Sequence, residues 1–191
     1  MKKFLIVFLV FGYCSSSNGG ESTKGKAKPE YDLVSVEKES SKELTLVMCG
    51  SFVYFPFGKI DKPDDLQASR LKDFAVKKTI TPENKITLFS LQNGTDRLTL
   101  HFRELNEEGP IGSYVVKGEI NSRSAWFLNG LHIGMSQSEF FGLFFESYPH
   151  QWKNLEAVQF DSCVADVRHI YSFSKGHMAN VKFECVDCAF K

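Results

Sequence analysis

The residues of this sequence best suited to carry out chemistry are its five cysteines: Cys14, Cys49, Cys163, Cys185 and Cys188. The last two form a C-x-x-C motif, a pattern that can serve redox or zinc chemistry. A redox pair normally sits at a helix N-terminus, which lowers a thiol pKa, whereas this pair ends a predicted strand. A structural zinc site needs two further ligands, and His169 and His177 are only loosely placed to supply them. We therefore expect structural disulfides or inert thiols, with no metal and no cofactor.

The four cysteines after Cys14 allow three disulfide pairings. A turn predicted at Lys175-Gly176 places Cys185 opposite Asp166 on the neighbouring strand, and so brings Cys163 near both Cys185 and Cys188. We expect one disulfide between Cys163 and this C-terminal pair, and Cys49 remains a further candidate.

Other catalytic signatures are missing from the sequence. The five histidines show no H-x-x-x-H or H-E-x-x-H spacing, and there is no G-x-S-x-G motif and no glycine-rich phosphate loop. The chain has 23 basic and 23 acidic residues, so no global field attracts nucleic acid. These observations favour a protein that is not an enzyme and does not bind nucleic acid.

Four aromatic residues are candidates for a binding face, because aromatic side chains often anchor interfaces: Trp126, Tyr148, Trp152 and Tyr171. Such a face would bind a protein or a glycan. The alternative is that these side chains belong to the hydrophobic core, which is common for aromatic residues in alternating strands.

The N-terminus predicts export. Met1-Lys2-Lys3 precedes the short apolar run Phe4 to Phe11, and we assign residues 1–13 to a signal peptide. The run ends in Phe11-Gly12-Tyr13-Cys14, which resembles the lipobox of bacterial lipoproteins. That resemblance implies lipidation of Cys14 and anchorage at the outer membrane, although Tyr13 is bulkier than the small residue usual there. Ordinary cleavage near Cys14 would instead give a periplasmic protein. Residues 14–30 lack large apolar residues and are rich in Ser, Gly and Lys, which predicts a flexible tether.

The first half of the folded part, residues 31–122, predicts strands around one helix. Leu44 to Phe57 is rich in β-branched and aromatic residues, and we expect one or two strands there. Asp61-Lys62-Pro63 predicts the start of a helix that runs to about Val76. Strands are expected at Asn84 to Gln92, at Thr95 to Arg103, joined by a type I′ turn at Asn93-Gly94, and at Ser113 to Ile120.

The second half, residues 123–191, predicts the same order. A strand at Ser124 to Leu128 is followed by a helix that ends near Tyr148-Pro149. Ser136 and Glu139 have the spacing of a capping box, and four phenylalanines (Phe140, Phe141, Phe144 and Phe145) give the helix one broad apolar face. Three strands are expected after it: Ala157 to Cys163, Asp166 to Phe173, and Met178 to Val186. The fold class predicted is thus α+β, two tandem strand-helix-three-strand units with antiparallel sheets; the alternative is a single irregular α+β domain with a large antiparallel sheet.

Gly134-Met135-Ser136 with Glu139 and the aromatic helix resembles the opening of the SmpA/OmlA lipoproteins, the BamE-like domain of the outer-membrane barrel-assembly machinery. The resemblance covers about Leu131 to Phe183. Two such units would resemble the β-lactamase-inhibitor-protein fold, which implies a concave binding surface. The first half has Gly58-Lys59-Ile60 where Gly-Met-Ser would stand, and no contact residue of either family can be matched to this chain.

Together these features predict an exported, lipid-anchored cell-envelope protein that acts by binding another, unidentified envelope protein. An assembly role and an inhibitor-like role both fit the resemblance. An envelope enzyme or a glycan-binding module is the alternative.

Overall fold

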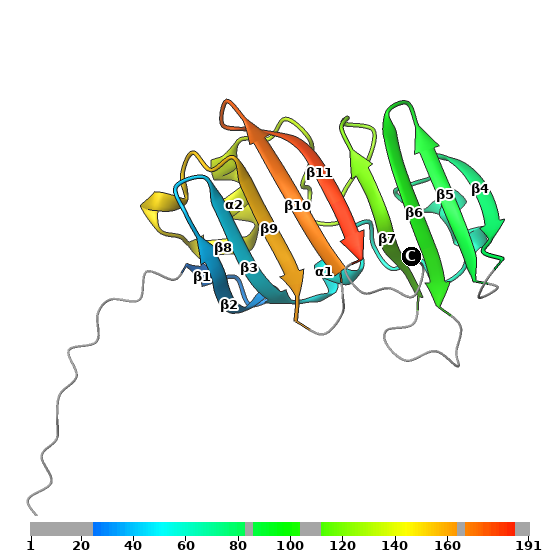
Figure 1. Ribbon diagram of the computed structural model, residues 1–191, viewed down its shortest axis with the longest axis horizontal. Helices are drawn as coiled ribbons and strands as arrows, with labels where there is room; N and C mark the ends of the chain where they lie inside the picture. Colours follow the sequence, from blue (N-terminus) through cyan, green and yellow to red (C-terminus); the bar gives the residue numbers. More distant parts are fainter. Residues whose placement is uncertain (1–24, 83–85, 104–111, 164–166, 186–191) are drawn as a thin grey trace, which may run out of the picture.

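The computed structural model describes residues 25–82, 86–103, 112–163 and 167–185. Nine strands form one mixed sheet in the order β2-β3-β9-β10-β11-β7-β6-β5-β4, in which β3 and β9 are parallel and all other neighbours are antiparallel (Figure 1). Their bounds, in chain order, are β2 Asp32–Glu39, β3 Glu43–Cys49, β4 Ala75–Ile80, β5 Thr87–Asn93, β6 Asp96–Arg103, β7 Gly112–Ile120, β9 Ala157–Ser162, β10 Val167–Ser174 and β11 His177–Cys185.

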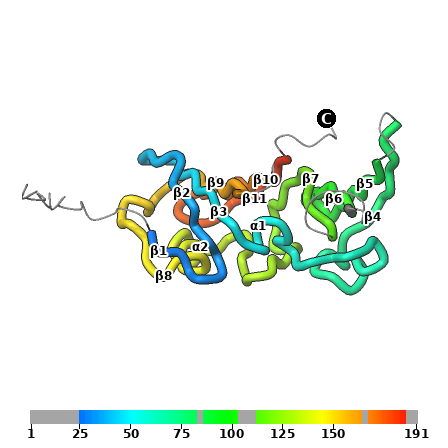
Figure 2. The backbone as a smooth tube through the Cα atoms, turned by 90° about the horizontal axis from the view of Figure 1, so that it is seen from below, coloured from blue at the N-terminus to red at the C-terminus, as the bar shows by residue number. Residues whose placement is uncertain are grey.

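A second, two-stranded sheet and four short helical segments lie outside this large sheet. The small sheet pairs β1 (Lys26–Ala27) with β8 (Phe145–Ser147). The helices are α1 (Ser51–Tyr54) and α2 (Gln137–Phe144), and the 3₁₀ segments are η1 (Pro63–Ala68) and η2 (His150–Trp152). Figures 1 and 2 show that α2, β1 and β8 lie on one side of the large sheet, and that none of the described elements covers the opposite face.

The prediction of two tandem strand-helix-three-strand units is wrong. The strands β2 and β3 of the first half pair with β9, so strands of the second half lie between β3 and β7 in one continuous sheet. The fold is mostly β, with few and short helices. Pairing between strands more than a hundred residues apart leaves no local signal in the sequence, which explains why periodicity suggested two separate units.

One helix predicted in the first half and one strand predicted in the second half do not form. The helix expected to reach Val76 ends as the 3₁₀ segment η1, because the Ser69 hydroxyl donates to the Leu66 carbonyl and accepts from the Leu71 amide. The strand expected at Ser124 to Leu128 is a run of turns, in which the Ser124 hydroxyl donates to the carboxylate of Asp96.

The local predictions of turns and of the helix cap are mostly confirmed. Ser136 caps α2, with its hydroxyl accepting from the Glu139 amide at 3.2 Å and its own amide donating to the Glu139 carboxylate at 2.7 Å. The β5–β6 hairpin is present, but its two-residue loop is Gly94-Thr95 and not Asn93-Gly94, because Asn93 pairs with Asp96. Of the residues in this turn Gly94 alone has positive φ, as expected for a turn with glycine at its first central position.

The aromatic face of α2 forms the centre of the core. Phe140, Phe141 and Phe144 are fully buried. Phe140 and Phe144 pack on the covered face of β9 and β10, with ring centroids 4.9 Å apart for Phe140 and Tyr171 and 4.8 Å for Phe144 and Phe160, whereas Phe141 packs on Trp152 at 5.6 Å. The helix ends earlier than expected, at Phe144, because the next three residues pair with β1. Burial of so many rings stabilises this half of the sheet by the hydrophobic effect and by edge-to-face contacts.

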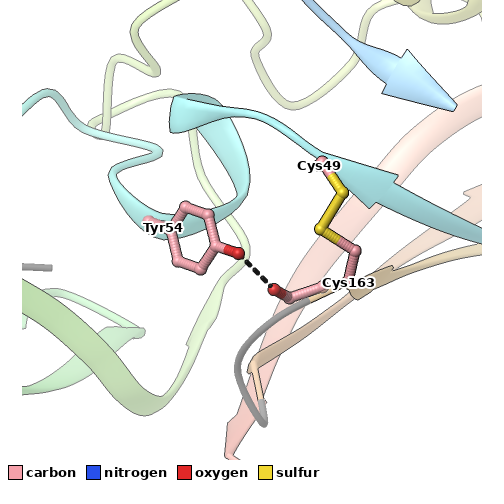
Figure 3. The surroundings of a disulfide bond; sticks show 4 residues. Cys49, Tyr54 and Cys163 are labelled. Carbon is pink, nitrogen blue, oxygen red and sulfur yellow. Dashed lines mark hydrogen bonds between the residues drawn. A yellow bond between two sulfur atoms is a disulfide. The ribbon is translucent and has the colours of Figure 1, made fainter. Parts of the chain in front are cut away.

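A disulfide joins Cys49, at the end of β3, to Cys163, directly after β9, with the two Cα atoms 5.3 Å apart (Figure 3). The Ser162 hydroxyl donates to the Tyr54 hydroxyl beside it at 2.9 Å, and the Cys163 amide donates to the Met48 carbonyl. The predicted bond between Cys163 and the C-terminal cysteines is therefore wrong. A bulge at Ser172 and Phe173 also places Cys185 opposite Val167 and not opposite Asp166.

Replacement of both Cys49 and Cys163 by alanine should lower the free energy of unfolding by roughly 4 kcal/mol, because the bond closes a loop with a sequence separation of 114 residues. Urea unfolding of the oxidised wild type and of the double variant measures this difference. Mass-spectrometric peptide mapping under non-reducing conditions should recover Cys49 linked to Cys163. A peptide that links Cys163 to Cys185 or Cys188 would contradict the pairing.

Candidate functional site

The uncovered face of the large sheet is hollowed into a groove of about 780 Å³. We call it the sheet groove. It follows β7, with β11 and β10 on one side and β6 and β5 on the other. Side chains that line it from this face include Leu88, Arg97, Thr99, Lys117, Glu119, Arg168, Lys182 and Glu184.

Charges alternate along two rows that cross the strands in the sheet groove. The register places residues of neighbouring strands directly opposite each other, where their side chains share one face. One row consists of Arg168, Glu184 and Lys117, and the other of Lys182, Glu119 and Arg97. Cross-strand neighbours in these rows therefore have opposite charges.

Part of this charge is satisfied within the protein. Arg168 donates from Nε to Asp161 Oδ1 at 2.8 Å and from a second nitrogen to Oδ2 at 3.2 Å, a two-point contact that raises the pKa of its guanidinium. Lys182 Nζ lies 2.5 Å from Glu184 Oε1, and this hydrogen bond raises the pKa of Lys182. Arg97 and Lys117 are exposed and form no ion pair with any residue that the structure describes. Within the described part of the chain, these two cations are therefore available to a ligand.

Gly118 on β7 allows the close strand approach at the bottom of the sheet groove. A Cβ atom at this position would lie 2.5 Å from the Arg97 carbonyl oxygen and 2.9 Å from Leu98 Cα, both of them backbone atoms that cannot yield. A bulge between Thr99 and Leu100 accompanies it, and bulges increase the local twist of a sheet. Glycine and bulge together therefore allow β6 and β7 to approach closely and to twist beside the sheet groove.

Asp96 fixes the beginning of β6 and so the position of Arg97. Its carboxylate is fully buried and accepts three hydrogen bonds: from the Asn121 amide at 2.7 Å, the Ser122 hydroxyl at 2.6 Å and the Ser124 hydroxyl at 2.5 Å. A buried carboxylate needs such partners to offset its desolvation. The sequence pattern Ser-x-Ser after a strand is a signal for such a contact that our sequence analysis missed, and neither Arg97 nor Lys117 was predicted as a site residue.

The structure does not bring the four predicted aromatic binding residues together. Trp152 and Tyr171 are buried, with exposed fractions of 1% and 0%, and they belong to the core. Tyr148 is half-buried and packs on Phe141 at a centroid distance of 4.9 Å. Trp126 is 59% exposed, but it lies outside the sheet groove.

The joint at Gly134-Met135-Ser136 has a structural role. The Gly134 amide donates to the Met178 carbonyl at 2.8 Å and the Met178 amide donates to the Met135 carbonyl at 2.9 Å, so the joint is attached to the hairpin of β10 and β11. Gly134 has φ of 89°, which favours glycine, and the Arg123 guanidinium occupies the space where a Cβ would lie.

Several predictions concern residues outside the described ranges. The signal peptide 1–13, Cys14, Cys188 and residues 14–24 of the tether are among them. Of the remaining tether, Lys26 and Ala27 form β1. Cys185 is disulfide-bonded. Within the described ranges no helix is long and apolar enough to cross a membrane, and no group of three or more His, Cys, Asp or Glu residues is arranged to hold a metal ion.

No protein family, no curated protein and no solved structure matches this chain. The resemblance to the SmpA/OmlA lipoproteins therefore rests only on Gly134-Met135-Ser136, Glu139 and the aromatic helix that follows. The function must be argued from the chain itself.

His169 is a buried titratable group of the core. It is fully buried between Phe52 and Phe183, with Nδ1 3.0 Å from the Tyr171 hydroxyl. Burial lowers its pKa from 6.5 to about 3, and the backbone of Val53 acts in the opposite direction with a smaller effect. The ring is therefore neutral in the folded protein near neutral pH.

This depressed pKa makes folding stability depend on pH. The unfolded chain protonates His169 below about pH 6.5 while the folded chain does not, so stability is complete above that pH and is lost as the pH falls toward 3. Between pH ~7.5 and ~5.5 the loss from this group is about 1.4 kcal/mol. In His169→Gln this part of the pH dependence should disappear from urea unfolding curves. His150→Gln, at an exposed position, is the control and should keep it; a His169→Gln protein with the wild-type pH dependence would contradict the assignment.

Proposed function

We propose that this chain is an exported cell-envelope protein that acts by binding another protein, and that the sheet groove is its binding surface. The observation that carries the proposal is that one face of the nine-stranded sheet is hollowed and covered by none of the described elements, and presents Arg97 and Lys117 without an ion pair to any described residue. Export is supported by Lys2-Lys3 and the apolar run after them, and by the disulfide between Cys49 and Cys163, since such bonds persist in oxidising compartments.

The chemistry of the sheet groove suits an acidic partner. Arg97 can hold a carboxylate through two parallel hydrogen bonds, and Lys117, two strand positions away on β7, adds a second positive charge. Leu88 on β5 and Val116 on β7 also line the sheet groove and provide apolar contacts beside these cations. Charged residues around an apolar centre are typical of protein interfaces.

A binding role fits the sheet groove better than catalysis. Cys185, which lines the groove, is disulfide-bonded and so is not a free nucleophile. The lining residues that the structure describes contain no histidine, and the carboxylate of Glu184 is held by Lys182. A general base beside a nucleophile, which acyl or phosphoryl transfer would need, is not assembled there.

A glycan-binding role has less support. Carbohydrate sites commonly use exposed aromatic rings, and the described lining of the sheet groove offers Phe183, which is buried. Trp126 and Tyr148 lie elsewhere.

Site-specific crosslinking tests the proposed function. A photoreactive amino acid at Thr99, in the sheet groove, should give a crosslinked protein in intact envelopes, and Arg97→Glu with Lys117→Glu should reduce its yield at least about tenfold by charge repulsion. Lys72→Glu with Lys153→Glu reverses two exposed charges outside the groove and is the matched control. An equal loss in both double variants, or a crosslink that neither changes, would contradict the assignment of the surface.

We also propose that Cys14 carries the lipid anchor. From residue 14 to residue 25 a fully extended chain reaches at most about 40 Å, so the anchored domain would stay close to the membrane surface. Mass spectrometry of the mature N-terminus should find a diacylglyceryl-modified Cys14, and Cys14→Ser should move the protein to the soluble envelope fraction. An unmodified N-terminus downstream of Cys14 would contradict lipidation and favour a periplasmic protein.

A further inference from the structure

The strand β4 is an edge strand of the large sheet, and no described residue pairs with its outer side. It is the last strand in the sheet order, pairs with β5 alone, and all six of its residues are exposed. Val76 is 41% and Ile80 57% exposed, which is unusual for β-branched apolar side chains in a sheet. Edge strands of this kind are templates for pairing with another chain.

The register shows which backbone groups of β4 are unpaired. The Thr81 amide, directly after the strand, donates to the Ile86 carbonyl at 2.9 Å, which places odd-numbered residues in hydrogen-bonded pairs with β5. In an antiparallel ladder the alternate residues point their amides and carbonyls the other way. The backbone groups of Val76, Lys78 and Ile80 therefore point away from the sheet.

We propose that β4 binds an extended segment of a partner protein as a tenth strand, and that this segment is acidic at its centre and apolar on each side. Lys77 and Lys78 are exposed and form no ion pair within the described part of the chain, so acidic residues directly opposite them would be favourable. Val76 and Ile80 flank Lys78 on the same face and would contact apolar residues of the added strand. Backbone hydrogen bonds would give the affinity and these side chains the specificity.

The same lysines disfavour a second copy of this chain as the occupant. In a two-fold antiparallel pairing of β4 with itself centred on Lys78, an outward-facing residue, Lys78 of one copy would lie directly opposite Lys78 of the other. Like charges directly opposite each other destabilise strand pairs. The inference goes beyond the sheet groove, since β4 does not line it, and it holds whether or not the groove binds a protein.

A labelled peptide with the central sequence Val-Thr-Glu-Glu-Val-Thr tests the proposal by fluorescence anisotropy with the full chain. Aligned antiparallel, it places Glu opposite Lys77 and Lys78 and Val opposite Val76 and Ile80. Saturable binding is expected below about 1 mM, and at least about tenfold weaker binding of the peptide with Lys in place of Glu. No saturable binding of the acidic peptide in this range would overturn the proposal.

Two variants at one position separate strand pairing from charge. Lys78→Pro removes an outward amide without breaking the ladder to β5 and should abolish binding, whereas Lys78→Ala keeps the amide and should weaken it by only a few-fold. Unchanged peptide binding by Lys78→Pro would overturn the proposal. If Lys78→Pro does not fold, Lys77→Glu with Lys78→Glu provides the test, because it should prefer the Lys peptide over the Glu peptide. Sedimentation that shows a dimer of the wild type, lost in Lys78→Pro but kept in Lys78→Ala, would instead assign the edge to a second copy.

Discussion

The parallel pairing of β3 with β9 is the contact on which the rest of the structure depends. It joins the first forty-nine residues to the last third of the chain, and without it β2 and β3 would have no place in the sheet. A parallel pair needs a long crossover connection, and here more than a hundred residues lie between the two strands. Closing so long a loop has a large cost in conformational entropy when the chain folds. The Cys49–Cys163 bond at the ends of both strands lowers this cost, because it already closes the loop in the unfolded chain.

This pairing also determines which face of the sheet is covered. Once β3, β9 and β10 are adjacent, their inward residues meet the phenylalanines of α2, and the aromatic core fills one side. The chain has no second long helix in the described ranges to cover the other side. The outward positions of β9, β10 and β11 are accordingly mostly polar, with Ile170 as an exception, and they are partly paired, as with Arg168 and Asp161.

How much of the structure could be predicted depended on how far apart in the sequence the contacting residues are. The capping box of Ser136 and Glu139, the hairpin turn at Lys175-Gly176 and most strand positions follow from residues within about ten positions, and they are confirmed. The sheet order, the disulfide partner of Cys163 and the burial of Trp152 depend on distant strands, so local periodicity could not predict them. Arg97 and Lys117 were missed for the same reason, because they share a surface only once β6 and β7 pair.

The charged side chains on the open face differ between the part of the sheet over the aromatic core and the part toward β4. Over the aromatic core, the open face carries internal pairs, Arg168 with Asp161 and Lys182 with Glu184. Toward β4, whose six residues are all exposed, Lys77, Arg97 and Lys117 lack such partners among the residues described. Unpaired cations add little to the stability of an isolated fold, since even paired surface charges contribute only about 0–1 kcal/mol. Folding stability therefore does not explain why these three cations lie on one part of the sheet, and their position is consistent with the acidic partner that we propose.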